Sequence, residues 1–354
     1  MRNKSAKVFS AVLAALLISL PAAAPVTAYA AGTAAANALI PGGMPFGVKL
    51  YTKGALVLGT TGIETVSGLT SPAKDCGLRA GDVIVRAGGA EFDSADELIR
   101  IVSGSGGRTL VLTFMRGEEE LRAEVTPVRE LESGKYRIGA LVRDSAAGIG
   151  TVTYIVPGTL EFGGLGHGIY DAGTSVLMPL KRGSVVNVDI SSVVKSERNE
   201  PGELHGEFSG KPCGELTANT AQGVFGRFYA LPANAGEPIP VAAPGELTEG
   251  KASILTTVKG GDARPYEAEI ERVYSGSGKT KNFLIKITDK RLLETAGGIV
   301  QGMSGSPVIK DGKLVGAVTH VLVNDPARGY GIYIGNMLAA SESGASESAY
   351  GLAA

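Results

Sequence analysis

The chain is poor in the residues that most cofactor and metal sites need. Its 354 residues include no tryptophan, two cysteines and three histidines, and its 34 basic residues nearly cancel its 35 acidic residues. No Cys/His cluster has zinc spacing, and neither a calcium loop nor a phosphate-binding glycine loop occurs. The sequence therefore predicts no cofactor and no metal. The balanced charge gives no sign of a nucleic-acid partner.

Glycine is abundant, whereas long amphipathic helical stretches are few. Fifty-one glycines and many short apolar runs are typical of a turn-rich β-protein. Cys76 and Cys213 fall in different predicted domains. An exported protein permits a disulfide, but a bridge here would tie together two domains that we expect to move, so we predict two free thiols.

The first thirty residues have the pattern of a targeting segment. Arg2, Lys4 and Lys7 precede an apolar run of thirteen residues, 8–20, and Ala28-Tyr29-Ala30 resembles a cleavage site. The run is shorter than the ~20 residues of a membrane span. We predict a signal peptide or signal anchor at 1–30, a linker at 31–40, and a remainder that lies outside the cytoplasm.

The hexapeptide Gly302-Met303-Ser304-Gly305-Ser306-Pro307 is the strongest motif. Glycines let a substrate carbonyl approach the backbone, and the N–H groups of Gly302 and Ser304 can point at one spot, where an oxyanion could form. A plain Gly/Ser/Pro turn is the alternative. Ser304 is the predicted nucleophile, and Ser306 is expected to shape the turn.

A serine nucleophile needs a base, most often histidine. His167 has glycine neighbours that leave its ring accessible, His205 lies in a polar stretch, and His320 ends the strand that follows the serine. We predict His167 as the base and His320 as a structural or pocket-lining residue. A carboxylate should orient the base, and spacing leaves Asp171, Asp289 and Asp325 as open candidates.

Four segments together resemble one family. They are 142–151, 165–169, 216–226 and 297–307, and the stretch 316–326 adds to them. They are similar to the stage IV sporulation protein B family, trypsin-like secreted serine peptidases of endospore-forming bacteria that carry a PDZ domain. The resemblance extends from about residue 40 to 340. It implies a catalytic triad of His167, Asp289 and Ser304.

Residues 41–128 are expected to form the PDZ domain. Pro45, Phe46, Gly47 and Val48 resemble the loop and strand that receive a peptide carboxylate through backbone N–H groups. Ser94, with Glu97 three residues later, predicts the start of a helix over 94–102. The groove between this helix and the strand near Val48 would bind a C-terminal or internal peptide; a purely structural spacer is the alternative.

Residues 135–345 are expected to form the peptidase domain. Short alternating apolar runs between glycines predict an all-β sandwich or barrel. With the order histidine, aspartate, serine, the fold class is mostly β: a PDZ domain followed by a chymotrypsin-like double β-barrel. Asp289 lies closer in sequence to the serine than the aspartate of chymotrypsin does.

The prediction is an exported serine endopeptidase. The resemblance implies self-cleavage near 32–39, and cleavage of a protein substrate in or at the membrane that activates a mother-cell sigma factor during sporulation. It also implies a location between the forespore and mother-cell membranes. One alternative is a PDZ adaptor with an inert peptidase scaffold. The other is a general envelope quality-control protease, although those usually place the PDZ domain after the peptidase.

Overall fold

The computed structural model describes residues 38–260, 262–274 and 280–350, the last six without their side chains. The predicted targeting segment 1–30 and residues 31–37 of the predicted linker lie outside this part of the chain. Among the described residues, no helix is long and apolar enough to cross a membrane. Both cysteines are free, as predicted.

Six antiparallel strands form a first ring. Each strand pairs with the next in the order β2, β11, β12, β15, β14, β13 and back to β2. Their alternating residues enclose a core that includes Phe46, Phe162 and Leu216. The strands are β2 (Pro45–Thr60), β11 (Ala140–Ile155), β12 (Glu161–Gly164), β13 (Leu180–Val194), β14 (Glu203–Thr220) and β15 (Gly223–Phe228).

Six later strands form a second, closed barrel. Its order is β17, β18, β19, β22, β21, β20, and its core includes Ile254, Phe283 and Val318. The strands are β17 (Gly250–Thr256), β18 (Arg264–Val273), β19 (Phe283–Ile287), β20 (Pro307–Lys310), β21 (Lys313–Leu322) and β22 (Asp325–Tyr333). Helix α3 (Lys290–Ala296) leads from β19 toward the serine. The predicted double barrel is confirmed.

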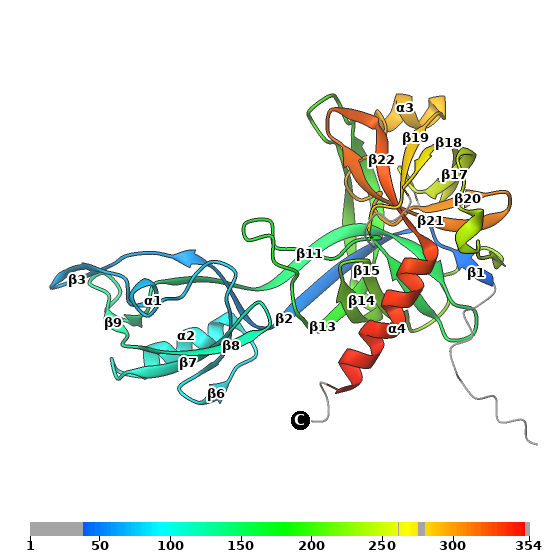
Figure 1. Ribbon diagram of the computed structural model, residues 1–354. Coiled ribbons are helices and arrows are strands. Elements are labelled where there is room, and N and C mark those ends of the chain that lie inside the picture. Colours follow the sequence, from blue (N-terminus) through cyan, green and yellow to red (C-terminus); the bar gives the residue numbers. More distant parts are fainter. Residues whose placement is uncertain (1–37, 261, 275–279, 351–354) are drawn as a thin grey trace, which may run out of the picture. The chain divides into compact units, whose positions relative to one another are not determined.

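The PDZ domain lies in the sequence between β2 and β11, and the two strands are shared with it. Residues 55–60 of β2 pair with 140–143 of β11 and with β5, whereas the other ends of both strands belong to the first ring; Figure 1 shows the two as long neighbouring strands. The remaining elements are β3 (Ile63–Thr65), β4 (Gly68–Thr70), α1 (Pro72–Asp75), β5 (Val83–Ala87), β6 (Ala90–Glu91), α2 (Ala95–Gly104), β7 (Leu110–Arg116), β8 (Glu119–Val125), β9 (Val128–Arg129) and β10 (Tyr136–Arg137).

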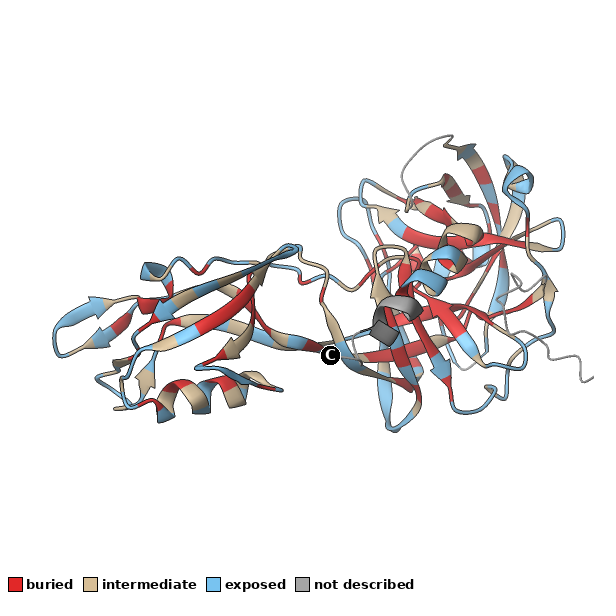
Figure 2. Cartoon of the chain, turned by 60° about the horizontal axis from the view of Figure 1, so that its bottom comes forward, coloured by how far each residue is buried: buried red, intermediate tan, exposed pale blue. Residues whose placement is uncertain are grey.

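Helix α2 begins where the sequence predicted. The Ser94 side chain accepts the Glu97 N–H at 3.2 Å, and the Glu97 carboxylate reaches back to the Asp93 N–H at 2.8 Å. Leu98 and Val102 are buried in the PDZ core while Ile99 is exposed. The alternation of buried and exposed residues along helix and strands can be followed in Figure 2.

The predicted boundary between linker and PDZ domain is wrong. Ile40 pairs with Ile155 of β11, so residues 38–40 lie in β1 (Ala38–Pro41) and not in a linker. Residues 45–52 belong to the first ring, because β2 pairs there with both β11 and β13. The first ring therefore begins in the sequence before the PDZ domain. The last elements are β16 (Ile239–Pro240), the 3-10 turn η1 (Pro244–Glu246) and α4 (Ile334–Tyr350).

Candidate active site

The turn at residues 301–306, called the serine turn below, connects α3 to β20. Gly302 and Gly305 have φ of +96° and +97°, a backbone region that disfavours side chains. A Cβ on Gly305 would lie 2.0 Å from the Thr151 carbonyl oxygen, so only glycine fits against β11. The Ser304 hydroxyl is partly exposed and donates to the Thr319 carbonyl at 2.7 Å.

Two N–H groups of the serine turn have no hydrogen-bond partner among the described residues. Within the described residues, the N–H groups of Met303, Gly305 and Ser306 donate to carbonyl oxygens, and those of Gly302 and Ser304 enter no hydrogen bond. These are the two donors that the sequence assigned to an oxyanion. A pair of unused donors beside a serine hydroxyl is what stabilisation of a tetrahedral intermediate requires.

His167 lies in the loop at residues 165–178, called the histidine loop below, directly after β12. Leu165 and Gly166 adopt positive φ and turn the chain there. A Cβ on Gly305 would meet Leu165 N at 2.5 Å, and one on Gly166 would meet the Thr319 side chain at 2.8 Å. The structure therefore brings the histidine loop against the serine turn, although 137 residues separate His167 from Ser304.

The histidine ring has a defined tautomer. Nδ1 of His167 lies 2.9 Å from the Gly168 carbonyl oxygen. A carbonyl only accepts, so Nδ1 carries the proton and Nε2 holds a lone pair. Burial lowers the pKa of His167, and the hydrogen bond to Gly168 opposes that effect. The ring is therefore neutral near pH 7, as a general base must be.

The structure does not bring Asp289 to His167, which corrects the triad that the family resemblance implied. Asp289 is the N-cap of α3: its carboxylate accepts the N–H groups of Arg291 and Leu292, and also the N–H of Glu267. The Arg291 guanidinium adds an ion pair at 2.7 Å. The side-chain hydrogen bond from Arg291 and these N–H groups lower the pKa of Asp289 to about 2. The carboxylate oxygens of Asp289 are therefore occupied in capping helix α3.

The other two aspartates also have partners elsewhere. Asp171 is buried in the histidine loop, where it accepts from Gly173, Thr174 and Arg143. Asp325 pairs with Arg328. Neither carboxylate contributes to the pKa shift of His167.

His320 lies beside His167. Its ring centroid is 4.9 Å from that of His167, with the planes tilted by 38°. Desolvation, with the nearby His167 and Lys281, lowers the pKa of His320 to about 4. Ser306 is buried, and its hydroxyl donates to the Met303 carbonyl at 2.6 Å, which is the turn-shaping role expected of it.

The predicted peptide-binding loop of the PDZ domain is wrong. Phe46 is buried in the core of the first ring, and a Cβ on Gly47 would meet Val186 and Phe208 of neighbouring strands. Residues 45–48 pair with β11 on one side and, from Phe46 on, with β13 on the other, so a peptide strand has no open edge there.

A different segment has the features expected of that loop. Ile138 is buried in the PDZ core, and Gly139, with φ of +76°, precedes the first residues of β11. Over 140–143, β11 pairs with β2 on one edge, and no other described strand pairs with the opposite edge. Helix α2 lies alongside, since the Ala95 N–H donates to Asp144 at 2.9 Å. In the sequence, Ile138-Gly139-Ala140 is an apolar residue and a glycine directly before a strand, a pattern that could have indicated this segment.

Asn219 is a site residue that the sequence analysis missed. Its amide oxygen accepts the Ile169 N–H at 2.8 Å, and its amide nitrogen donates to the carbonyls of Ile169 and Met178 at 3.0 and 2.9 Å. These three bonds fix the histidine loop from β14, two residues beyond His167. No local sequence pattern around Asn219 predicts these hydrogen bonds.

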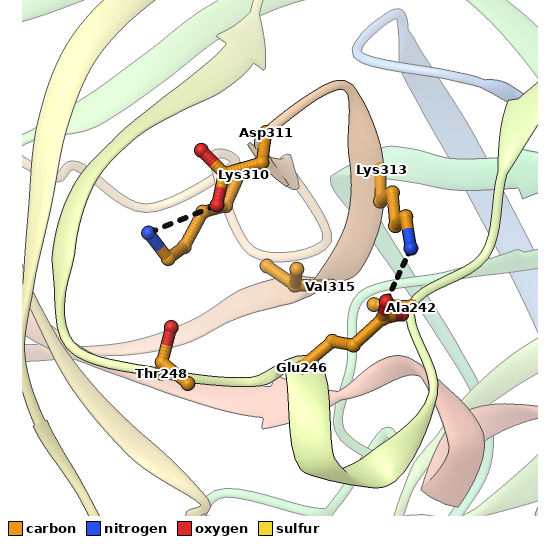
Figure 3. Close-up of a pocket in the computed structure, with 7 residues that line it drawn as sticks. All are labelled: Ala242, Glu246, Thr248, Lys310, Asp311, Lys313 and Val315. Atoms are coloured by element: carbon orange, nitrogen blue, oxygen red, sulfur yellow. Dashed lines mark hydrogen bonds and ion pairs between the residues drawn. The ribbon is translucent and has the colours of Figure 1, made fainter.

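A pocket of about 210 Å³ lies on the second barrel away from these residues. Figure 3 shows its lining, with the ion pairs Lys313 to Glu246 and Lys310 to Asp311. None of the predicted catalytic residues lines it.

The family model described as SpoIVB peptidase S55 matches residues 134–338, more than half of the 354, and a PDZ domain model matches 66–116. No curated protein matches.

Solved structures share low identity with the chain. It is 18% identical to the Rv3671c protease of M. tuberculosis in its active form, over 56% of this chain and 74% of that one, with a TM-score of 0.34. It is 12% identical to the HtrA-type protease AlgW with decapeptide, over 58% of this chain and 55% of that one, with a TM-score of 0.34. It is 24% identical to the PDZ domain of an SdrC-like protein from Listeria monocytogenes, over 25% of this chain and 87% of that one, with a TM-score of 0.22.

Proposed function

Because this chain belongs to the SpoIVB peptidase S55 family, we propose that it is an exported serine endopeptidase that cleaves itself and a membrane-bound regulatory protein during endospore formation. That cleavage would activate a mother-cell sigma factor from the space between the forespore and mother-cell membranes. The contact between the serine turn and the histidine loop carries the peptidase part of this proposal. The family match supports the sporulation part.

The reaction begins with the Ser304 hydroxyl, which turns from the Thr319 carbonyl to His167. Nε2 of His167 takes the hydroxyl proton as Ser304 Oγ attacks the peptide carbonyl carbon. The developing oxyanion is bound by the N–H groups of Gly302 and Ser304. His167 then gives its proton to the leaving amine, and water hydrolyses the acyl-enzyme by the same path.

The Gly168 carbonyl takes the orienting role in this scheme. It holds Nδ1–H of His167 and so keeps Nε2 as the basic nitrogen. A carbonyl dipole stabilises the imidazolium less than a carboxylate would, because it carries only a partial charge.

Within the same proposal, the PDZ domain binds the partner as an added strand. The open edge of β11 at 140–143 would pair with the peptide, and the Gly139 loop would receive its terminal carboxylate. Ile101 of α2 is partly buried against the PDZ core and would line this groove.

The nucleophile is tested with Ser304→Ala and the control Ser306→Ala. Ser304→Ala should abolish self-cleavage and labelling by a fluorophosphonate probe while circular dichroism stays unchanged, because losing the nucleophile lowers turnover by several orders of magnitude. Ser306→Ala should keep measurable activity. Persistent labelling of Ser304→Ala would refute the assignment.

The groove is tested with Ile101→Glu, matched by Ile99→Glu on the exposed side of the same helix, where the side chain is 55% exposed. Ile101→Glu should keep probe labelling and lower cleavage of the membrane-bound partner about tenfold or more, since a buried unpaired carboxylate opposes docking. Ile99→Glu should behave as wild type. Equal cleavage of the membrane-bound partner by both variants would show that the PDZ domain is only a structural spacer.

A further inference from the structure

Every carbonyl of the serine turn from residue 301 to 305 accepts a hydrogen bond from the protein. The peptide groups of the turn are thus held at each of these carbonyl oxygens. In order along the chain, the donors are Leu204 N, Thr151 Oγ1, Ser306 N with Ser306 Oγ, Thr151 N, and Thr153 Oγ1.

Most of these donors come from the first ring, not from the barrel that carries the serine. Thr151 and Thr153 lie on β11, with side chains 1% and 0% exposed. Their hydroxyls donate to the carbonyls of Gly302 and Gly305, both at 2.8 Å. Because both hydroxyls are buried, no water competes for these two carbonyls.

The direction of the carbonyls determines where the N–H groups point. In a trans peptide the C=O of one residue and the N–H of the next share a plane and point in opposite directions. The planes that carry the Gly302 and Ser304 N–H groups hold the carbonyls of Gln301 and Met303, which accept from Leu204 and Ser306. Thr151 binds the planes on both sides of the Ser304 N–H, through its hydroxyl at the Gly302 carbonyl and its N–H at the Ser304 carbonyl, and the Thr153 hydroxyl binds the next plane, at the Gly305 carbonyl. With the flanking planes held in this way, the N–H groups of Gly302 and Ser304 remain without a partner among the described residues. Glycine at 302 and 305 leaves the backbone little intrinsic preference against other conformations, so the groups that bind the carbonyls have to supply the restraint.

We propose that Thr151 and Thr153 are positioning residues for the oxyanion site. Their hydroxyls hold the serine turn from the neighbouring ring, in the conformation in which Gly302 and Ser304 can donate to the substrate. The proposal rests on the proposed function of Ser304. It implies that the catalytic competence of the second barrel depends on the contact with β11.

The experiment compares Thr151→Val, Thr153→Val and the double variant with Thr151→Ser and Thr153→Ser. Valine keeps the shape and removes the hydroxyl, whereas serine keeps the hydroxyl. Thr256→Val is the matched control, since Thr256 is fully buried and its hydroxyl has no hydrogen-bond partner in the described structure. The readouts are kcat and KM on a peptide substrate and the affinity for a peptide aldehyde, which forms a tetrahedral adduct.

Each valine variant should lower kcat about tenfold or more, and the double variant should approach the ~10²–10³ loss that follows removal of an oxyanion donor. KM should change little, and aldehyde affinity should fall in parallel with kcat. The serine variants should keep kcat near wild type, and Thr256→Val should be unaffected.

Three results would overturn the proposal. They are unchanged kcat in the folded double valine variant, equal losses in the serine and valine variants, and a loss confined to KM. Should the valine variants fail to fold, the serine variants still decide, because a hydroxyl role requires them to stay active. Failure of the proposed function is a separate outcome, seen as full activity of Ser304→Ala.

Discussion

The serine turn and the histidine loop lie against each other but are held by different means. In the serine turn the bound groups are backbone carbonyls: two glycines at positive φ permit its path, and donors that lie mainly on the first ring bind its carbonyls. The histidine loop is held by side chains that bind it directly: Asn219 from β14 binds Ile169 and Met178, and the buried Asp171 binds Thr174 and Arg143.

This difference indicates which mutations should disturb the serine turn and which should disturb the histidine loop. A backbone-held turn tolerates substitutions that spare its glycines and its donors. The histidine loop depends strongly on the Asn219 amide, because its removal breaks three hydrogen bonds together and leaves the Ile169 N–H and the Met178 carbonyl without a partner among the described residues. His167 should therefore be easier to displace by a distant mutation than Ser304.

Asn219→Ala is the sharpest way to test this difference. It removes three hydrogen bonds and should lower the free energy of unfolding by about 2–4 kcal/mol, at about 1 kcal/mol each plus unsatisfied groups. It should also lower kcat/KM about 100-fold, because a misplacement of about 1 Å at the base can cost that much. Activity assays and thermal unfolding measure both effects.

The control for Asn219→Ala is Asn187→Ala, on an exposed position of β13. It should change neither stability nor activity. If Asn219→Ala lowered stability but left kcat/KM intact at a temperature where the protein is folded, Asn219 would be a structural residue only. The histidine loop would then be no more sensitive to distant mutations than the serine turn.

Sequence patterns predicted the features whose causes are local. The helix start at Ser94 depends on Glu97, three residues away, and the serine turn depends on its own glycines. Short alternating strands predicted an all-β sandwich or barrel, and the order histidine, aspartate, serine predicted the double barrel. The choice of His167 as the predicted base was made among only three histidines.

Features that depend on distant partners could not be predicted in the same way. Residues 45–48 look like a PDZ loop, yet they begin the sixteen-residue strand β2. The first half of β2 pairs with β13, which begins at residue 180. Asn219 likewise acts on a loop fifty residues earlier. Asp289 is different, since an aspartate before Lys290-Arg291-Leu292-Leu293 has a helix N-cap pattern that was available in the sequence.

The smallest expected effect on activity comes from Asp289→Asn. If Asp289 oriented the base, this change would cost about 10⁴ in rate. Because asparagine caps a helix about as well as aspartate, a cap role predicts kcat/KM within a few-fold of wild type.

Losing the charge of Asp289 opposite Arg291 should lower the free energy of unfolding at pH 7 by about 1–2 kcal/mol, since the pKa of Asp289 is lowered to about 2 from 3.8. A lowered folded-state pKa gives stability that is complete above the unfolded value and is lost as the pH falls through the folded one. The difference in unfolding free energy between wild type and Asp289→Asn should therefore be constant above about pH 5 and shrink toward pH 2, as measured by urea unfolding across that range. A loss of activity near 10⁴ with unchanged stability would restore Asp289 to the catalytic group, and the histidine half of the site would then be held by charge as well as by the Asn219 amide.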